Sequence, residues 1–307
     1  MSAAAGAGVL SGAKLFGAVR GGLAVISPGT ATNTSFKIGG DLGVNRLGFG
    51  AMRITGEGIW GWPPDRANAV KVLKHAVELG VDLIDTADAY GPETSELLIA
   101  EALHPYPKGL VIATKGGNTR PSPGQWVPNG RPDYLKACVD KSLQRLKLDR
   151  IDLWQLHRID PKVPVEESLG AIKEARDAGK IRHVGLSEVS AEEIERAKKV
   201  VPIVSIQNRY NFDDRKWEKA LEYCEKENLG FLPWAPVGGT RGLGGGAADA
   251  VAKAHNVSVY QVALAWLLQR SPVMLPIPGT QNLKHLEDNC ASAKLKLTPE
   301  EWRSLAA

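Results

Sequence analysis

Cysteine is scarce in this sequence, and its placement argues against two classes of small protein. The 307 residues include three cysteines, Cys138, Cys224 and Cys290, which are widely spaced and odd in number. None belongs to a C-x-x-C motif, so we expect neither a disulfide framework nor a structural zinc site. The chain also lacks an apolar run long enough to span a bilayer, so we expect no membrane segment.

Acidic residues are absent from the first forty positions, which carry most of the net charge of +4. Lys14, Arg20 and Lys37 contribute +3 there and leave +1 for the rest of the chain. A nucleic-acid-binding protein concentrates basic residues on its folded face, so we expect no nucleic-acid partner.

The composition divides the chain into two parts. Residues 1–34, rich in Ala, Gly, Ser and Thr, predict an appended or disordered leader, and residues 35–307 a single domain. A basic segment without acids is also typical of transit peptides, so organelle targeting stays open beside a cytoplasmic location.

From residue 46 onward, short apolar runs alternate with stretches of 3.6-residue periodicity. The runs predict strands at residues 47–52, 83–85, 110–114, 151–156, 183–186, 203–206, 230–234 and 273–277. The periodic stretches predict helices at 65–79, 94–103, 134–146, 165–178, 191–199, 215–227, 259–268 and 283–290, with short extra helices at 249–254 and 299–305. This α/β alternation predicts a (β/α)8 TIM barrel, since eight units of roughly 30 residues fit a closed barrel.

Two further features bear on the fold. Residues 36–44, with Gly39-Gly40-Asp41 at their centre, predict an N-terminal β-hairpin that is placed to plug the bottom of the barrel. A doubly wound open sheet is the alternative fold. It requires a glycine-rich phosphate-binding turn after the first strand, and Gly50-Ala51-Met52-Arg53 is not such a turn.

Four polar residues lie at or after the ends of three neighbouring predicted strands. Asp85 ends the second strand and Tyr90 follows it, Lys115 follows the third strand and His157 follows the fourth. Each alone could be an ordinary surface or packing residue. Because the carboxyl ends of barrel strands meet at one mouth, we expect the four side chains to converge there.

These residue types suit proton donation to a carbonyl oxygen. Tyrosine is a poor acid at neutral pH, and a nearby Lys115 ammonium should lower the pKa of Tyr90. Asp85 would keep Lys115 charged and in place. Neutral His157 can donate a hydrogen bond to the same oxygen. The hydride must come from a cofactor, because no side chain supplies one.

The stretch Asp85-Thr86-Ala87-Asp88-Ala89-Tyr90-Gly91 resembles the Asp/Tyr motif of the aldo-keto reductase family. Lys115 and His157 match the family's other two catalytic positions, and the resemblance extends over nearly all of residues 36–305. It implies reduction of aldehydes or ketones with NADP(H), without a metal, and with Tyr90 as the proton donor. It also implies a small-molecule carbonyl substrate and a monomer or weak homo-oligomer.

The resemblance further implies where the cofactor lies. Ser187 and Gln207 would bind the carboxamide, and Trp234 would stack on the nicotinamide. Glu188 stands where many members of the family have asparagine, so it is left out of the predicted cofactor-binding residues. The remaining positions cover the pyrophosphate, the adenosine phosphate and the adenine. The complete cofactor set is Gly50, Ala51, Met52, Ser187, Gln207, Trp234, Pro236, Val237, Gly238, Gly239, Gly279, Thr280, Lys284, His285, Asp288 and Asn289.

The substrate is left open by the sequence. Trp60 and Trp126 in the mouth loops are consistent with an apolar or aromatic aldehyde and equally with a packing role. Residues 263–272 resemble a bacterial subgroup that includes pyridoxal reductase. Two other functions are weighed: a redox-sensing NADP-binding module with little turnover, and a metal-dependent barrel hydrolase. The hydrolase would need clustered ligands at strand ends, where His157 is the one clear histidine.

Overall fold

The computed structural model of the protein describes residues 34–238 and 245–305. Residues 1–33 of the expected leader, and Gly239 of the expected cofactor loop, lie outside this range. In the described part of the chain, no helix is long and apolar enough to cross a membrane.

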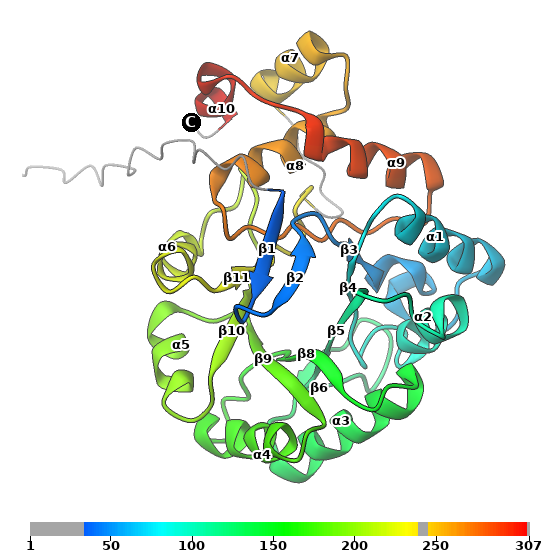
Figure 1. Ribbon diagram of the computed structural model, residues 1–307, viewed down its shortest axis with the longest axis vertical. Helices are drawn as coiled ribbons and strands as arrows, with labels where there is room; N and C mark the ends of the chain where they lie inside the picture. The colour runs from blue at the N-terminus through cyan, green and yellow to red at the C-terminus, as the bar shows by residue number, and fades with distance from the viewer. Residues whose placement is uncertain (1–33, 239–244, 306–307) are drawn as a thin grey trace, which may run out of the picture.

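Parallel strands form the main sheet, which curls into a barrel (Figure 1). Their spatial order follows their order in the chain, as expected for successive right-handed βα units. The strands are β3 (Phe49–Gly50), β4 (Leu83–Asp85), β5 (Val111–Gly116), β8 (Ile151–Leu156), β9 (Ile181–Ser187), β10 (Ile203–Gln207) and β11 (Gly230–Phe231). These bounds confirm the predicted barrel.

The barrel is closed by residues 273–278, which do not form a regular strand. Leu275 N donates to Phe231 O at 2.7 Å on one side, and Gly48 N donates to Pro276 O at 2.9 Å on the other. Because proline has no N–H group, Pro276 cannot take part in a full ladder. The predicted eighth strand is therefore an extended segment that joins β11 to β3.

Helices surround the strands (Figure 1). They are α1 (Arg66–Glu78), α2 (Thr94–Leu103), α3 (Pro132–Leu146), α4 (Val165–Asp177), α5 (Ala191–Lys198), α6 (Glu218–Glu227), α8 (Val259–Arg270) and α9 (Leu283–Ala291). The additional helices α7 (Gly246–His255) and α10 (Pro299–Leu305) pack together beside α8.

Side-chain caps explain where several helices begin. Asp65 accepts a hydrogen bond from Asn68 N at 2.8 Å before α1, and Ser190 forms a capping box with Glu193 in α5. Helix α6 begins three residues later than predicted. Turns precede it, because Asn211 Oδ1 accepts hydrogen bonds from the backbone N–H groups of residues 213 and 214.

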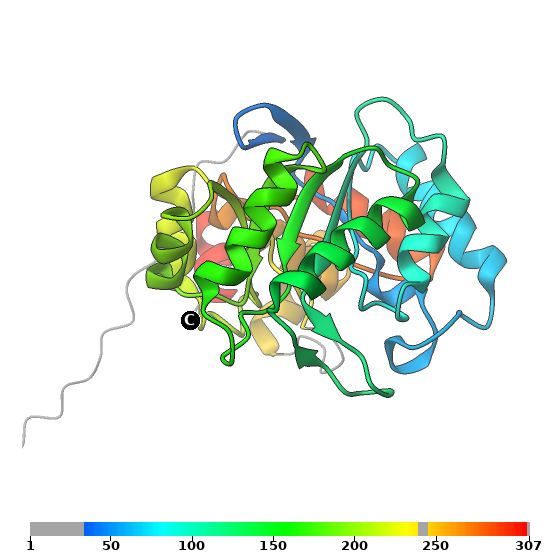
Figure 2. The ribbon, with the colours of Figure 1, turned by 90° about the horizontal axis from the view of Figure 1, so that it is seen from below.

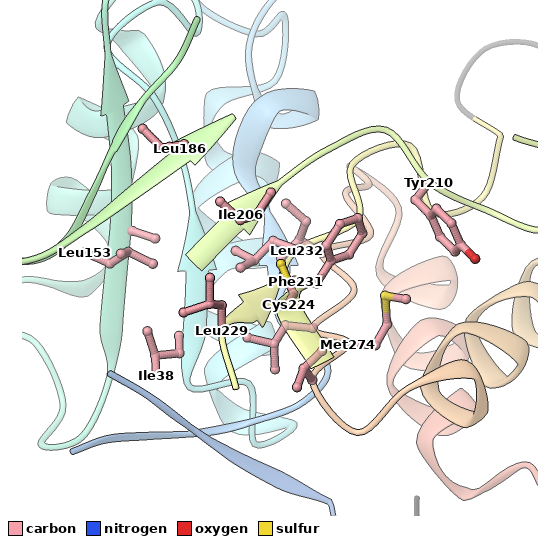
Figure 3. Close-up of a cluster of buried hydrophobic side chains, with 14 of the residues drawn as sticks. Ile38, Leu153, Leu186, Ile206, Tyr210, Cys224, Leu229, Phe231, Leu232 and Met274 are labelled. Atoms are coloured by element: carbon pink, nitrogen blue, oxygen red, sulfur yellow. The ribbon is translucent and has the colours of Figure 1, made fainter. Parts of the chain in front are cut away.

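The N-terminal hairpin closes one end of the barrel. Its strands β1 (Ser35–Ile38) and β2 (Leu42–Asn45) are antiparallel and alternate buried and exposed residues. Figure 1 shows the hairpin lying across the barrel opening, and Figure 3 shows Ile38 beside Leu153 and Leu229 of the barrel. Asp41 at its tip pairs with Arg182 and His183 at the start of β9. The hairpin therefore plugs this end, as predicted.

The opposite end carries the longer loops, as the side view shows (Figure 2). Strands β6 (Asn118–Thr119) and β7 (Val127–Pro128) form a small hairpin there that was not predicted. The first predicted strand is also shorter than expected, because η1 (Ala51–Ile54) follows β3 and a second 3-10 turn, η2 (Glu57–Ile59), comes soon after. Met52 thus lies in η1 rather than at the end of a strand.

Candidate active site

Lys115 lies at the centre of a buried polar network at the open end of the barrel. Its Nζ donates to Asp85 Oδ2 at 2.6 Å, to Thr86 O at 2.7 Å and to Tyr90 OH at 3.2 Å. Lys115 is fully buried, and Asp85 and Tyr90 nearly so. The ammonium is thus held between a carboxylate and a phenol. This confirms the expectation that side chains at the ends of β4 and β5 converge.

Two buried glutamines orient the carboxylate of Asp85. Gln155 on β8 and Gln207 on β10 donate their Nε2 groups to Asp85 Oδ1 at 3.1 and 2.8 Å. Gln207 Nε2 also lies 3.4 Å from Gln155 Oε1. Because both carboxylate oxygens accept hydrogen bonds, Asp85 is held in one orientation toward Lys115.

Burial and charge act on this network in opposite directions. Burial disfavours the charged form of Lys115, but Asp85 and Tyr90 outweigh it and raise the pKa of the ammonium. Burial raises the pKa of the Tyr90 phenol, and the Lys115 charge only partly offsets this. The expectation of a lowered pKa for Tyr90 is therefore wrong in direction, because a buried phenolate also loses solvation. Tyr90 is protonated at neutral pH.

His157 faces the same space from the end of β8. Its ring centroid lies 5.8 Å from that of Tyr90, and the two rings are nearly perpendicular. Burial, assisted by the positive charges of Lys115, Arg158 and Arg120, lowers the pKa of His157 well below its usual range. The imidazole is thus neutral, and its buried Nδ1 has no hydrogen-bond partner among the described residues.

An aromatic side chain covers Tyr90 and His157. Trp126, from the loop between β6 and β7, makes edge contacts with Tyr90 and His157 at centroid distances of 6.2 and 6.0 Å. The guanidinium of Arg120 lies 3.7 Å from the centroid of Trp126 and 5.4 Å from that of Trp60. It also donates to the carbonyl oxygens of residues 59, 89 and 125. Arg120 thus ties the mouth loops together around Trp126.

These side chains open into a cavity of about 710 Å³, a size suited to a sizeable organic ligand. The cavity extends from Tyr90 and His157 past Ser187 and Gln207 to Trp234 and on toward Gly279. Within residues 34–238 and 245–305, no three His, Cys, Asp or Glu side chains are grouped so that they could hold a metal ion.

Comparison with known proteins places the chain in a family. The model of the aldo/keto reductase family matches residues 46–307. The chain belongs to the aldo/keto reductase family.

Relatives of this aldo/keto reductase include an oxidoreductase of Schizosaccharomyces pombe that is 51% identical over 87% of both chains. Another is the pyridoxine 4-dehydrogenase of Escherichia coli, 39% identical over 87% of this chain and 95% of the relative. Among solved structures, a thermostable aldo-keto reductase in complex with the inhibitor epalrestat is 31% identical. It matches with a TM-score of 0.77 over 89% of this chain and 98% of that one.

The cavity of this aldo/keto reductase brings together part of the predicted cofactor set. Its lining includes Gly50, Met52, Ser187, Gln207, Trp234, Pro236, Val237, Gly238 and Gly279. The predicted residues outside the lining, apart from the undescribed Gly239, are Ala51, Thr280, Lys284, His285, Asp288 and Asn289. Of the two predicted substrate residues, Trp126 lines the cavity and Trp60 does not; Trp60 contacts Arg120, which in turn stacks on Trp126.

Two details bear on the predicted adenosine phosphate site. Lys284 is exposed and forms an ion pair with Asp288 at 2.7 Å, so its charge is compensated within α9. Gly279 packs so closely against Gly50 that a side-chain Cβ would collide with the Gly50 carbonyl oxygen. A larger residue at position 279 would therefore require the backbone to move.

Several cavity residues were missed by sequence reasoning. Arg53, Arg158 and Arg209 line the cavity, and Gln155 orients Asp85 from behind. Gln155 lies on the buried strand β8, two residues before His157, and this period-2 spacing could have identified it. The arginines could not be distinguished from solvated residues, because loop conformation determines where their side chains point.

Glu188 also has a role that the sequence did not indicate. It has a positive φ of 58° at the end of β9, and its Oε1 accepts hydrogen bonds from Trp234 Nε1 at 2.8 Å and from Arg209 N at 2.6 Å. Trp217 Nε1 lies 3.3 Å from its other oxygen. Glu188 therefore fixes the indole of Trp234 at the cavity wall.

Proposed function

We propose that this protein reduces aldehydes or ketones to alcohols, with NADPH as the hydride donor and Tyr90 as the general acid. The observation that carries the proposal is the contact of Lys115 with both Asp85 and Tyr90, next to a neutral His157 and at the wall of a large cavity. Such a constellation serves an oxygen that gains negative charge as hydride adds to its carbon.

The residues around the cavity fit a nicotinamide dinucleotide. NADP(H) is the cofactor that the family uses, and when bound it would supply the hydride. Gln207 donates its Nε2 to Asp85, so the Oε1 of Gln207 remains as an acceptor for a carboxamide N–H. The indole of Trp234 offers a flat face held by Glu188, and Arg53 adds positive charge suited to phosphates.

Tyr90 would hold the proton that is transferred to the substrate oxygen. The Lys115 ammonium stabilises the phenolate that remains after transfer, and Asp85 keeps that ammonium in place. His157 is neutral and orients the same oxygen through a ring N–H. Trp126 gives the substrate side of the cavity an aromatic character, consistent with an aromatic aldehyde.

The test is consumption of NADPH with a panel of aromatic and aliphatic aldehydes in the presence of a chelator. Pyridoxal belongs in the panel, because a relative with 39% identity is named pyridoxine 4-dehydrogenase. We expect equimolar NADPH oxidation and alcohol formation, with NADH a poorer donor. Tight NADPH binding without turnover on any substrate would instead support a redox-sensing module.

A further inference from the structure

Arg158 is a charged residue of the cavity wall that forms no hydrogen bond with Asp85, Tyr90 or Lys115. It directly follows His157, is half-buried and lines the cavity. Its Nη1 donates to the His157 carbonyl oxygen at 2.5 Å and to Ser187 Oγ at 2.9 Å. The guanidinium is therefore anchored at one nitrogen, between the catalytic histidine and a predicted cofactor residue.

The other donors of Arg158 are unused in the protein alone. Within the described residues, Nε and Nη2 form no hydrogen bond and no carboxylate lies within ion-pair distance of the side chain. The charge of Glu188 is near enough to oppose the lowering of the Arg158 pKa by burial, but Glu188 does not contact the guanidinium. Arg209, on the same cavity, differs because Asp214 pairs with it at 2.8 Å. A partly desolvated cation without a carboxylate partner is costly, so an anion that enters the cavity would be favoured at Arg158.

The position of Arg158 points to the substrate rather than to a distant part of the cofactor. The ring of His157, its neighbour in the chain, lies 5.8 Å from the ring of Tyr90, where the carbonyl oxygen must bind. Trp126 covers the same corner with an aromatic face. A ligand that fills this corner would combine an aromatic or apolar body with an anionic group at Arg158.

We infer that Arg158 binds a carboxylate of the substrate, so that the preferred substrates are aldehydes or ketones that carry a carboxylate. This inference rests on the proposed carbonyl reduction and narrows its substrate class. A guanidinium with adjacent free Nε and Nη2 donors can bind both carboxylate oxygens at once. The hydrogen bonds of Arg158 to Ser187 and to the His157 carbonyl oxygen would hold the guanidinium in the orientation needed for that contact.

The experiment compares carboxybenzaldehydes with nitrobenzaldehydes. A nitro group has the planar shape of a carboxylate but no net charge, and the ortho, meta and para isomers sample the unknown spacing. We expect the wild type to prefer at least one carboxylated isomer in kcat/KM. In Arg158→Gln that preference should fall by about 10–100-fold, as for the loss of a charge-assisted bond. Arg158→Lys should retain part of it, since it keeps the charge.

Arg209→Gln is the matched control, because it removes a positive charge from the same cavity at a paired site. It should leave the ratio between the two substrate series unchanged. A second readout avoids turnover: calorimetric binding of 4-carboxybenzaldehyde and of 4-nitrobenzaldehyde to the enzyme with NADP⁺, which has no hydride to donate. Only the affinity for the carboxylated aldehyde should weaken in Arg158→Gln.

Each contrary outcome is distinct. Equal use of both substrate series by the wild type overturns the inference, as does an equal loss of both in Arg158→Gln, which would mark a positioning residue. Weaker NADPH binding in Arg158→Gln with an unchanged substrate ratio would assign the anion to a cofactor phosphate and also overturn it. Failure of the proposed function looks different, since the wild type would then reduce neither series.

Discussion

The two ends of the barrel each contain a carboxylate bonded to basic side chains, but in opposite surroundings. At the closed end, Asp41 of the hairpin pairs with Arg182 and His183, and its side chain is 54% exposed. At the open end, the side chains of Asp85 and Lys115 are 2% and 0% exposed. Exposed pairs contribute little because water and salt screen them, whereas a buried charge that loses its partner is costly.

The open end also contains polar atoms without partners. Asp88 Oδ1, Asn118 Oδ1 and His157 Nδ1 are buried and unbonded among the described residues. The described hairpin residues at the closed end contribute none to that group. Stable packing usually satisfies such atoms, and exceptions concentrate where a protein binds or reacts. The closed end thus serves stability, and the open end keeps polar groups at some cost to stability.

The substitution with the largest expected effect removes the Tyr90 hydroxyl at the open end of the barrel. Tyr90→Phe should lower kcat for aldehyde reduction by roughly 10²–10⁴, the usual contribution of a positioned general acid. NADPH affinity, measured by fluorescence titration, should change little because the hydroxyl serves the carbonyl oxygen. Tyr134→Phe is the control, since its hydroxyl donates to Asn118 O outside the catalytic network. Near-normal turnover in Tyr90→Phe would remove Tyr90 from its assigned role.

Loss of the ammonium should damage both turnover and stability. In Lys115→Met the pKa of Tyr90 should rise further, because the positive charge that opposes burial is gone. Tyr90 would then be a weaker acid, and the alkaline limit of the pH–rate profile should move to higher pH. The variant should also lose about 3–5 kcal/mol of unfolding free energy, since Asp85 would remain buried without its cation.

A double-mutant cycle tests whether the two charges act as one unit. Asp85→Asn and the double variant Asp85→Asn/Lys115→Met complete the cycle with Lys115→Met. The double variant should be more stable than additivity predicts, by about 0.5–3 kcal/mol, because it leaves no unpaired charge. Strict additivity in urea unfolding would show that the 2.6 Å contact contributes nothing to the folded state.

Much of the open end could be predicted from sequence because strand direction determines it. Asp85, Lys115 and His157 each lie at or just after the end of a strand with a clear apolar pattern, and parallel strands bring their ends together. The direction of the pKa shift of Tyr90 could not be predicted, since it depends on how completely the phenol is buried. The β6–β7 hairpin was missed because its strands are two residues long and carry no periodic pattern.

The site residues of loops and turns were harder to predict than those of strands. Arg158 and Glu188 lie next to His157 and Ser187 in the chain, yet their partners come from β9 and from residues beyond β10. Pro276 shows that sequence patterns also have a limit in predicting the strands of the fold. The sequence pattern indicated a strand at 273–277, but the hydrogen bonds there depend on which N–H groups exist.

Asp88 provides a smaller test that changes stability with pH. Burial raises the pKa of its carboxyl to about 7, so folding favours the protonated form. Stability from this group is present below the ordinary pKa of 3.8 and is lost as pH rises to 7. Asp88→Asn should therefore stabilise the protein by about 2–4 kcal/mol above pH 7, using 1.4 kcal/mol per pKa unit, and have little effect near pH 3.

A second aspartate gives the opposite sign and serves as the control for Asp88. Backbone N–H groups of Gly130 and Lys162 lower the pKa of Asp160. Asp160→Asn should then destabilise the protein at neutral pH and lose that effect as pH falls below 3.8. Urea midpoints of both variants across pH 3–9 check the two signs, and parallel curves would contradict the assignment for Asp88.

The smallest expected effect is at the closed end, where Asp41→Asn removes the carboxylate of the hairpin tip. Because Asp41 is more than half exposed, the variant should lose less than about 1 kcal/mol of unfolding free energy. Arg182 and His183 lower the pKa of Asp41, so the loss should appear above pH 3.8, vanish below it and shrink in high salt. Aldehyde reduction should be unchanged, because Ile38 and its apolar neighbours still seal the barrel. A loss of turnover in Asp41→Asn without unfolding would mean that the two ends are coupled, and the separation of stability from chemistry would fail.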